Sequence, residues 1–304
     1  MPSSQPAPPL RPVADDERES FNRDGAVLLR GVLDPTWVDS LRDGLEAAYA
    51  APDNMSVELA ESADAAIRID QFPAARCDLL AEFLRRSPVA ELVGQAMRAP
   101  IRFYMDQMFY KPAGELMATA WHQDTPYYNV VGDDLVRAWV SCDATPRAAS
   151  LEVVRGSHRW NVTYRPLGGS PPTERKTSGI VERQLTDDPQ FSYGASARDL
   201  SLPPVPDIEG HRGSFEIMGW DYQPGDVILF HGNILHGAGG HVRLDHPRRA
   251  HASMWAGPDV AFLRRRGQVI PDPPALEAAA PPDGTLLADL DDIFPTVWAP
   301  PTAH

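Results

Sequence analysis

The sequence predicts an all-β core preceded by a layer of helices. Helical spacing of apolar residues is confined to roughly the first third of the 304-residue chain. From residue 101 onward, short runs rich in aromatic and branched residues alternate with Gly and Pro turns, which is typical of strands. Helices first and many short strands later indicate a β domain that carries helices on one side.

The helical part follows a Pro-rich stretch. Residues 1–14 hold five prolines and little apolar material, so we expect a disordered lead-in. Asp34 and Pro35 suit the N-cap and the first position of a helix. The apolar face of that helix would hold Trp37, Val38, Leu41, Leu45 and Tyr49. Two further helices are expected over 75–86 and 88–97.

The strands occupy most of the remaining chain. They are expected over residues 101–111, 117–123, 135–143, 151–154, 214–220, 226–230 and 248–255. Residues 51–74 show no clear pattern, and the long polar stretch 159–212 is expected to be a lid or insert. We therefore expect one domain over 15–257, followed by a Pro-rich acidic tail, 258–304, that could pack on it.

Composition excludes several classes of protein. A formal net charge of −14 argues against nucleic acid or an anionic membrane as a general partner. Two cysteines, Cys77 and Cys142, provide neither a disulfide framework nor a Cys-rich zinc site. The N-terminal stretch does not have the pattern of a signal peptide, and no apolar run approaches the ~20 residues of a membrane-spanning helix. We expect the protein in a reducing cytoplasm.

One short motif has the composition of a metal site. His122 and Asp124 are separated by one residue, and on a strand such residues point to the same face. An imidazole and a carboxylate on one face are two of the three ligands of a 2-His-1-carboxylate iron site. Alone, the motif fits equally a surface His beside a turn or capping Asp.

A second stretch, residues 224–239, offers the third ligand. A short apolar strand leads into His231, and His236 follows where the chain opens into small residues. Small neighbours leave room around a metal ion, so His236 is the preferred ligand and His231 the alternative.

These pieces resemble the phytanoyl-CoA dioxygenase family of Fe(II)/2-oxoglutarate-dependent oxygenases. The resemblance extends from Phe21 to about Gly257. The matching residues are His122-Gln123-Asp124, Trp139, Gly156-Ser157-His158, Gly225-Asp226-Val227, His236-Gly237 and Arg248-Arg249-Ala250. The resemblance implies a double-stranded β-helix (jelly roll, cupin-like), with His122, Asp124 and His236 as the catalytic iron ligands. It also implies Fe(II), 2-oxoglutarate and O2 as cofactor and co-substrates.

The resemblance further indicates which residues bind 2-oxoglutarate. Its distal carboxylate needs a cation, and an arginine can grip it with two parallel hydrogen bonds. Arg248 fits the family's position, whereas Arg249 would point to the opposite face of the same strand. Trp139 and Gln107 match positions that line the cofactor pocket. His158 belongs to a turn that the family uses structurally.

The substrate is less well indicated. Tyr127 and Tyr128 directly follow the metal motif and would either line the floor of the substrate pocket or only fill the core. Seven basic residues stand against three acids between residues 147 and 183: Arg147, Arg155, Arg159, Arg165, Arg175, Lys176 and Arg183. This excess suggests that the lid, with Arg155 as a candidate, recognises an anionic group on a small-molecule substrate. The alternative is that these cations pair with acids elsewhere in the chain.

The leading hypothesis is an oxygenase that converts 2-oxoglutarate to succinate and CO2 while oxidising a small molecule, most simply by hydroxylation. Desaturation, ring formation and epimerisation remain open outcomes. Halogenation is disfavoured because Asp124 fills the position that halogenating relatives leave open for chloride. Two alternatives are a non-catalytic cupin-like binding module and a zinc hydrolase with the same His/Asp/His set. The hydrolase lacks an evident general base and leaves Arg248 without a role.

Overall fold

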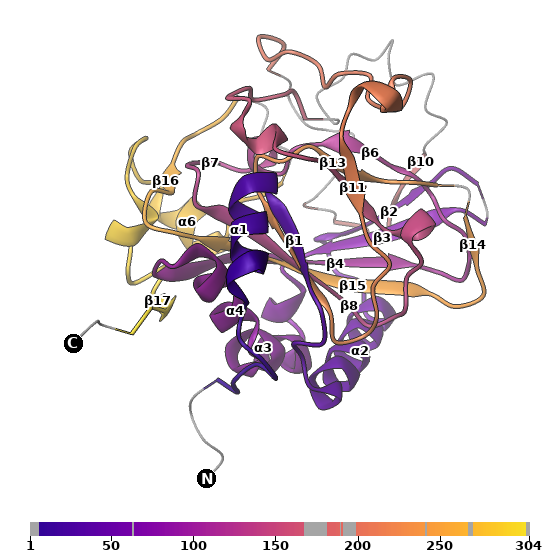
Figure 1. The fold of residues 1–304 in the computed structure, drawn as a ribbon, viewed down its shortest axis with the longest axis horizontal. Helices are drawn as coiled ribbons and strands as arrows, with labels where there is room; N and C mark the ends of the chain where they lie inside the picture. Colours follow the sequence, from indigo (N-terminus) through magenta and orange to yellow (C-terminus); the bar gives the residue numbers. More distant parts are fainter. Residues whose placement is uncertain are drawn as a thin grey trace.

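Two antiparallel sheets lie face to face in the computed structural model, which describes residues 6–62, 64–166, 181–188, 190, 199–240, 242–266 and 270–301 (Figure 1). Within this part of the chain, the larger sheet has nine strands and the smaller sheet has four. Side chains of both sheets, such as Trp139 from the larger and Val153 from the smaller, share one buried cluster. The predicted all-β core with an N-terminal helical layer is therefore confirmed.

The larger sheet has the order β1 (Ala26–Leu29), β12 (Val227–His231), β8 (Leu135–Ser141), β15 (Arg248–Ala256), β4 (Ile101–Lys111), β3 (Ala66–Gln71), β2 (Ser56–Ala60) and β10 (Val181–Gln184), with β17 (Thr296–Trp298) beside β4. The smaller sheet has the order β11 (Ile217–Gly219), β9 (Leu151–Val154), β13 (His236–Ala238) and β6 (Thr119–His122). Two short pairs join β5 (Gly114–Glu115) to β14 (Arg243–Leu244) and β7 (Val130–Val131) to β16 (Ala261–Phe262).

Helices cover the outer face of the larger sheet: α1 (Asp15–Asp24), α2 (Pro35–Ala50), α3 (Asp78–Arg86) and α4 (Val89–Met97) (Figure 1). The predicted start of α2 is confirmed, because Asp34 accepts a hydrogen bond from the Thr36 amide at 2.9 Å. Tyr49 of α2 stacks on Tyr110 of β4 with ring centroids 3.9 Å apart. A short helix, α6 (Pro274–Ala279), lies in the C-terminal part.

A cross-strand row of side chains lines the inner face of the larger sheet. Gln71, Gln107, Ala252, Trp139 and Ile228 stand directly opposite one another on neighbouring strands. Residues paired in this way point to the same face. The alanine in the middle has a small, buried side chain that stands between the two glutamines and the indole. This row connects the two ends of the site described below.

Residues 51–74 show no clear pattern in the sequence, yet β2 and β3 form there. Val57, Ile67 and Ile69 belong to the core, while charged residues alternate with them. Arg68 and Asp70 are nevertheless buried, because Arg68 Nε donates to Asp70 Oδ1 at 2.7 Å. Alternating charged residues predict an exposed strand face unless it is known that the charges pair with one another.

The described part of the N-terminal stretch differs from the disordered lead-in that was expected. The Ala7 amide donates to the Arg86 carbonyl at 2.8 Å, and the Leu10 amide donates to the Val32 carbonyl at 3.0 Å. Val13 is buried in the helical layer. Backbone pairing with the domain therefore holds these residues, despite their proline content.

The C-terminal part also contacts the domain. Phe294 is buried and stacks on Tyr104, and β17 adds to the edge of β4. Of the expected lid, residues 167–180, 189 and 191–198 lie outside the described residues, and β10 pairs with β2. Among the described residues, no helix is both long and apolar enough to span a bilayer.

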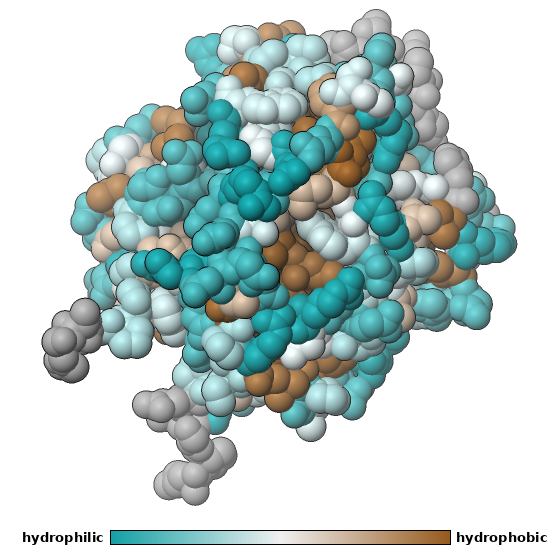
Figure 2. Space-filling view, viewed as in Figure 1, coloured by the Kyte–Doolittle hydropathy of each residue, from teal (hydrophilic) through white to brown (hydrophobic). Residues whose placement is uncertain are grey.

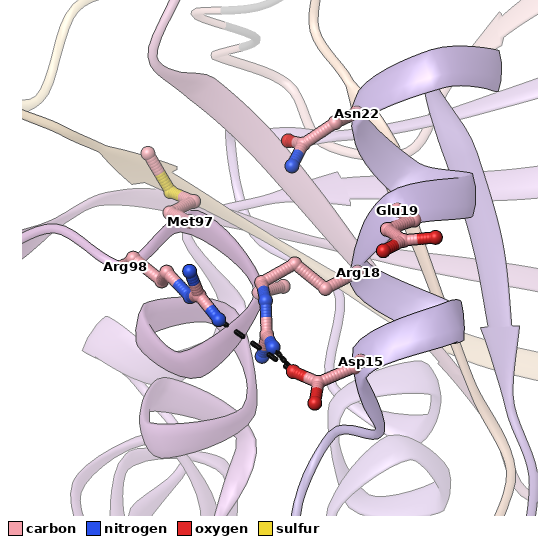
Figure 3. A pocket seen from close by; sticks show the side chains of 7 residues that line it. Asp15, Arg18, Glu19, Asn22, Met97 and Arg98 are labelled. Atoms are coloured by element: carbon pink, nitrogen blue, oxygen red, sulfur yellow. Dashed lines mark ion pairs between the residues drawn. The ribbon is translucent and has the colours of Figure 1, made fainter.

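The helical side carries a polar pocket between α1 and the end of α4 (Figure 3). Asp15 forms ion pairs there with Arg18 of the same helix and with Arg98 at the end of α4, and the second pair joins the two helices. Figure 2 shows this face of the molecule as mainly hydrophilic, with separate hydrophobic areas. The pocket contains none of the predicted site residues.

Gly25 is a point at which the fold constrains the sequence. It ends α1 with φ 83°, and a Cβ at this position would overlap the His158 ring. Gly31 also has a positive φ, 59°, but a Cβ there would meet nothing within 4 Å.

We expect Gly31→Ala to lower the free energy of unfolding by about 1 kcal/mol through backbone strain alone. Gly25→Ala should lower the free energy of unfolding by about 1–3 kcal/mol more than Gly31→Ala, because the added methyl group overpacks against the His158 ring. Urea unfolding measures both, and equal losses would contradict the proposed steric contact.

Candidate metal centre

Two histidines meet across the smaller sheet. His122 ends β6, and the antiparallel register sets it directly opposite His236, the first residue of β13. Their ring centroids are 4.2 Å apart. Residues that are paired across strands share one face, so both imidazoles project from the same side of the sheet.

Asp124 reaches the histidines by a different route from the one expected. The motif suggested strand alternation, but β6 ends at His122 and Asp124 has right-handed helical backbone angles. The amides of Asp124 and Thr125 both donate to the Gly232 carbonyl, at 2.9 and 3.0 Å. This turn places Asp124 Oδ1 3.7 Å from His122 Nε2 and 3.6 Å from His236 Nε2.

The imidazoles are oriented to bind a metal through Nε2. His122 Nδ1 lies 2.8 Å from the Ala120 carbonyl, and His236 Nδ1 lies 3.1 Å from the Ile234 carbonyl. A carbonyl can only accept, so each Nδ1 carries the proton and each Nε2 keeps its lone pair. The three ligand atoms lie within 4.8 Å of one another, which suits a single ion.

Burial of the histidines and the charges around Asp124 keep these ligands in the protonation state that a metal requires. Burial lowers the pKa of His122, and burial together with the neighbouring His122 lowers the pKa of His236 to about 3. Burial alone would raise the pKa of Asp124, but the charges of Arg137 and the two histidines lower it to about 2. Neutral imidazoles beside a carboxylate are the ligands of a 2-His-1-carboxylate site.

Gln123 faces away from the metal ligands and anchors their segment. Its Nε2 donates to the carbonyls of Val162 and Asn233 at 2.9 and 2.8 Å, and its Oε1 accepts from the Tyr164 amide at 2.9 Å. The side chain is buried. The metal segment is thereby tied both to the turn before β13 and to the first part of the expected lid.

Sequence reasoning did not identify Arg137 as a residue of the site. It lies on β8 with 2 % exposure, and its Nε donates to Asp124 Oδ2 at 2.9 Å. Its Nη2 donates to the Tyr128 hydroxyl at 2.7 Å. A single arginine in the apolar run of β8 was the available signal, since a buried arginine requires an acceptor.

A second charged region lies on the inner face of the larger sheet. Arg248 of β15 pairs with Lys111 of β4 in register, and both side chains are buried. Arg248 Nη1 donates to the Ala149 carbonyl and Lys111 Nζ to the Met117 carbonyl, each at 2.7 Å. Burial, and then the charge of Arg248, lower the pKa of Lys111 well below its usual value. A buried arginine beside a buried lysine suits a carboxylate, whose charge would favour the protonated lysine. Sequence reasoning did not identify Lys111.

The two neighbouring arginines take opposite faces of β15, as strand alternation predicts. Arg249 donates to Asp143 through its amide, Nε and Nη2, and to Glu46 through Nη1 at 2.7 Å. Arg248 instead faces inward, with its guanidinium carbon 5.6 Å from the centre of the Trp139 ring. Of the pair, only Arg248 lies beside the indole on the inner face.

The two predicted lining residues differ in whether their polar atoms already have hydrogen-bond partners. Trp139 lies on the inner row, and its buried indole Nε1 has no hydrogen-bond partner among the described residues, so it offers a donor to a bound molecule. Gln107 is engaged instead with other side chains. Its Oε1 accepts from the Tyr128 hydroxyl at 3.2 Å, and its Nε2 donates to Gln71 Oε1 at 2.8 Å.

The predicted substrate residues also differ from one another. Tyr127 lies edge-on to the His122 ring, with centroids 5.7 Å apart. Tyr128 is buried, and its hydroxyl accepts a hydrogen bond from Arg137 Nη2 at 2.7 Å. Arg155 forms ion pairs with Asp24 at 2.6 Å and with Glu216.

Other cations of the expected lid have partners as well. Arg159 donates to the Arg23 carbonyl at 2.6 Å, and Arg183 donates to Glu58 at 2.8 Å. Arg175 and Lys176 lie outside the described residues. Arg155 and Arg183 therefore pair with acids elsewhere in the chain, as the alternative interpretation expects, whereas Arg159 contacts a backbone carbonyl.

The His231 ring is engaged by a nearby backbone amide. Its Nδ1 accepts from the Asn233 amide at 3.0 Å, and its ring lies 5.0 Å from that of His158. The described residues that could hold a metal ion are His122, Asp124 and His236.

These features define a class of enzyme. Three N/O ligands on one face and a buried cationic end within a two-sheet β fold are the parts of an Fe(II)/2-oxoglutarate-dependent oxygenase. A family model described as Phytanoyl-CoA dioxygenase (PhyH) matches residues 21–250, and the chain belongs to this family. The predicted cofactors, Fe(II) and 2-oxoglutarate, are thereby confirmed.

Curated relatives and solved structures agree with this assignment. The chain is 24% identical over 243 residues to an ectoine dioxygenase of Sphingopyxis alaskensis, which covers 76% of the chain and 72% of the relative. It is 22% identical over 241 residues to that of Nocardia farcinica, with 76% and 74% covered. The structure of SnoN, an alpha ketoglutarate dependent epimerase from nogalamycin biosynthesis, matches with a TM-score of 0.67 and 19% identity, covering 95% of this chain and 98% of that one. The predicted jelly roll is thereby confirmed.

Metal binding should persist in mild acid. At an ordinary imidazole pKa of about 6.5, lowering the pH from about 7.5 to 5.5 weakens metal binding roughly tenfold for each histidine. The pKa values of His122 and His236 are lowered, so protons compete less with the metal. We expect the Co(II) affinity, measured by anaerobic absorbance titration, to change less than about tenfold over this range. A fall of about a hundredfold would show ordinary imidazoles.

The two arginines of β15 provide a matched test of the cationic end. Arg248→Met and Lys111→Met should each weaken 2-oxoglutarate binding by about 10–100-fold, because each removes a charge-assisted contact. Arg249→Met should leave that affinity unchanged, since Arg249 contacts Asp143 and Glu46 on the other face. Calorimetric titration of the Co(II)-loaded protein measures all three variants. The opposite ranking of the two arginines would reverse this assignment.

Proposed function

We propose that this oxygenase hydroxylates a C–H bond of a small molecule while 2-oxoglutarate is converted to succinate and CO2. His122, His236 and Asp124 would hold the iron from one face, leaving three positions open. Bound iron with 2-oxoglutarate supplies the oxidising power from O2. The task of the protein is to hold both groups and the substrate in fixed geometry.

The observation that supports this proposal most is that two unlike charged regions line the interior of the fold, the histidines on the smaller sheet and the arginine with the lysine on the larger. The imidazoles and Asp124 suit a metal ion, and Arg248 with Lys111 suits a carboxylate. Trp139 lies against Arg248 with a free indole donor. A dicarboxylate with a chelating end and a distal carboxylate uses both regions at once. A zinc hydrolase or a simple binding module would leave the buried cation pair without an anion.

The substrate would approach from the side of Tyr127. Its ring borders His122, and Gln123 links the metal segment to the lid at Val162 and Tyr164. The relatives act on ectoine, and one SnoN structure contains nogalamycin RO. An anionic substrate remains a proposal resting on Arg175 and Lys176, and a cytoplasmic location one resting on the free cysteines Cys77 and Cys142.

The test combines a spectrum with product analysis. Anaerobic addition of Fe(II) and 2-oxoglutarate should give a weak visible charge-transfer band. Candidate small molecules are then screened for stimulated succinate formation under isotopically labelled O2. Hydroxylation predicts a product that gains one labelled oxygen atom. A product of unchanged mass would indicate epimerisation, and loss of two hydrogens would indicate desaturation or ring closure.

Asp124→Ala provides the control for this test. It should abolish both the band and succinate formation, because it removes the one anionic ligand, while the circular-dichroism spectrum stays that of the parent. A parent protein with neither the band nor succinate formation would contradict the proposed function.

A further inference from the structure

We propose that Arg137 is a positioning residue that fixes Asp124 so that only Oδ1 reaches the metal. The inference rests on the proposed iron site and concerns a residue that does not touch the metal itself. Arg137 Nε donates to Asp124 Oδ2 at 2.9 Å, while Oδ1 is the oxygen that faces both imidazoles. The two carboxylate oxygens therefore have separate partners.

Arg137 is held in place on every side. Nη2 donates to the Tyr128 hydroxyl at 2.7 Å, and Nη1 lies 3.5 Å from the Ala252 carbonyl and 3.9 Å from Met105 Sδ. The side chain is 2 % exposed. A planar guanidinium with fixed partners cannot follow a rotating carboxylate, so it determines the rotation of Asp124.

A relay of buried polar side chains stabilises this position. The Tyr128 hydroxyl donates to Gln107 Oε1 at 3.2 Å, and Gln107 Nε2 donates to Gln71 Oε1 at 2.8 Å. The backbone of Tyr128 is held by the C-terminal part of the chain, because Arg265 Nε donates to its carbonyl at 2.9 Å. The metal ligand is thus connected to two strands and to a segment beyond the family match.

The function of this arrangement follows from counting coordination positions. Two histidines and one carboxylate oxygen leave three positions on an octahedral ion, and 2-oxoglutarate and O2 together need all three. A carboxylate that chelates through both oxygens would occupy one of them. Arg137 occupies Oδ2 and thereby keeps Asp124 to a single bond. The same contact makes the buried carboxylate part of a neutral pair before the metal arrives.

The chain provides a matched control. Arg68, on β3, is also buried and donates through Nε to a carboxylate, Asp70 Oδ1, at 2.7 Å. Asp70 faces the helical side and is also paired with Arg76. Arg68→Met therefore breaks an ion pair of the same kind and burial without touching the metal site. A purely structural role for Arg137 predicts the same behaviour for both methionine variants.

The experiment compares Arg137→Met, Arg137→Lys and Arg68→Met, each loaded anaerobically with Co(II). The Co(II) visible spectrum reports the coordination number, and calorimetry gives the dissociation constant for 2-oxoglutarate. We expect Arg137→Met to change the spectrum and to raise that constant about 10–100-fold, an effect of the size that metal affinity shows when the partner of a metal ligand is lost. Arg137→Lys should restore part of both. Arg68→Met should lower the melting temperature but keep the parent spectrum and affinity.

Tyr128→Phe keeps the proposal testable if Arg137→Met does not fold. It removes an acceptor of Arg137 but leaves the guanidinium, so we expect a smaller change of the spectrum and affinity in the same direction. A parent-like spectrum and affinity in Arg137→Met, or in Tyr128→Phe where the former is unfolded, would overturn the proposal. A parent protein that binds Co(II) but not 2-oxoglutarate would instead contradict the proposed function. The Co(II) spectra of the variants would still test the role of Arg137.

Discussion

The antiparallel pairing of β6 with β13 determines the geometry of the whole site. It places His122 opposite His236, and each imidazole is then oriented by the carbonyl two residues earlier in the chain. Asp124 follows β6 by one turn, and its amide donates to the Gly232 carbonyl in the connection between β12 and β13. A shift of this register by one residue would turn one imidazole to the other face and dismantle the ligand set.

Buried charge explains how the interior of the fold is used. Asp124 and Arg137 form one internal pair, whereas Arg248 and Lys111 bring two cations together on the same inner face. Burying charges costs free energy unless partners compensate, so the cationic end is balanced only when an anion binds. A fold that tolerates this imbalance is organised for a dianionic co-substrate, and the larger sheet supplies the rigid support.

Sequence reasoning found the residues that belong to local motifs and missed those whose partners are distant. The metal ligands were indicated by a His-x-Asp motif and a His beside small residues, although the turn that brings Asp124 into place was not foreseen. Arg137 and Lys111 gain their roles from partners on other strands, so spacing carries no signal for them. The same applies to β2 and β3, where the Arg68–Asp70 pair hides a buried strand. Arg155 was chosen for local charge, but Asp24 and Glu216 engage it.

The most direct test of the central claim is an anaerobic crystal structure with Fe(II) and 2-oxoglutarate. We expect iron bound by Nε2 of both histidines and by Oδ1 alone of Asp124. The distal carboxylate of 2-oxoglutarate should contact Arg248 and Lys111, with the Trp139 indole along its path. An iron that takes a fourth protein ligand, or a 2-oxoglutarate whose distal carboxylate lies away from Arg248 and Lys111, would contradict the account.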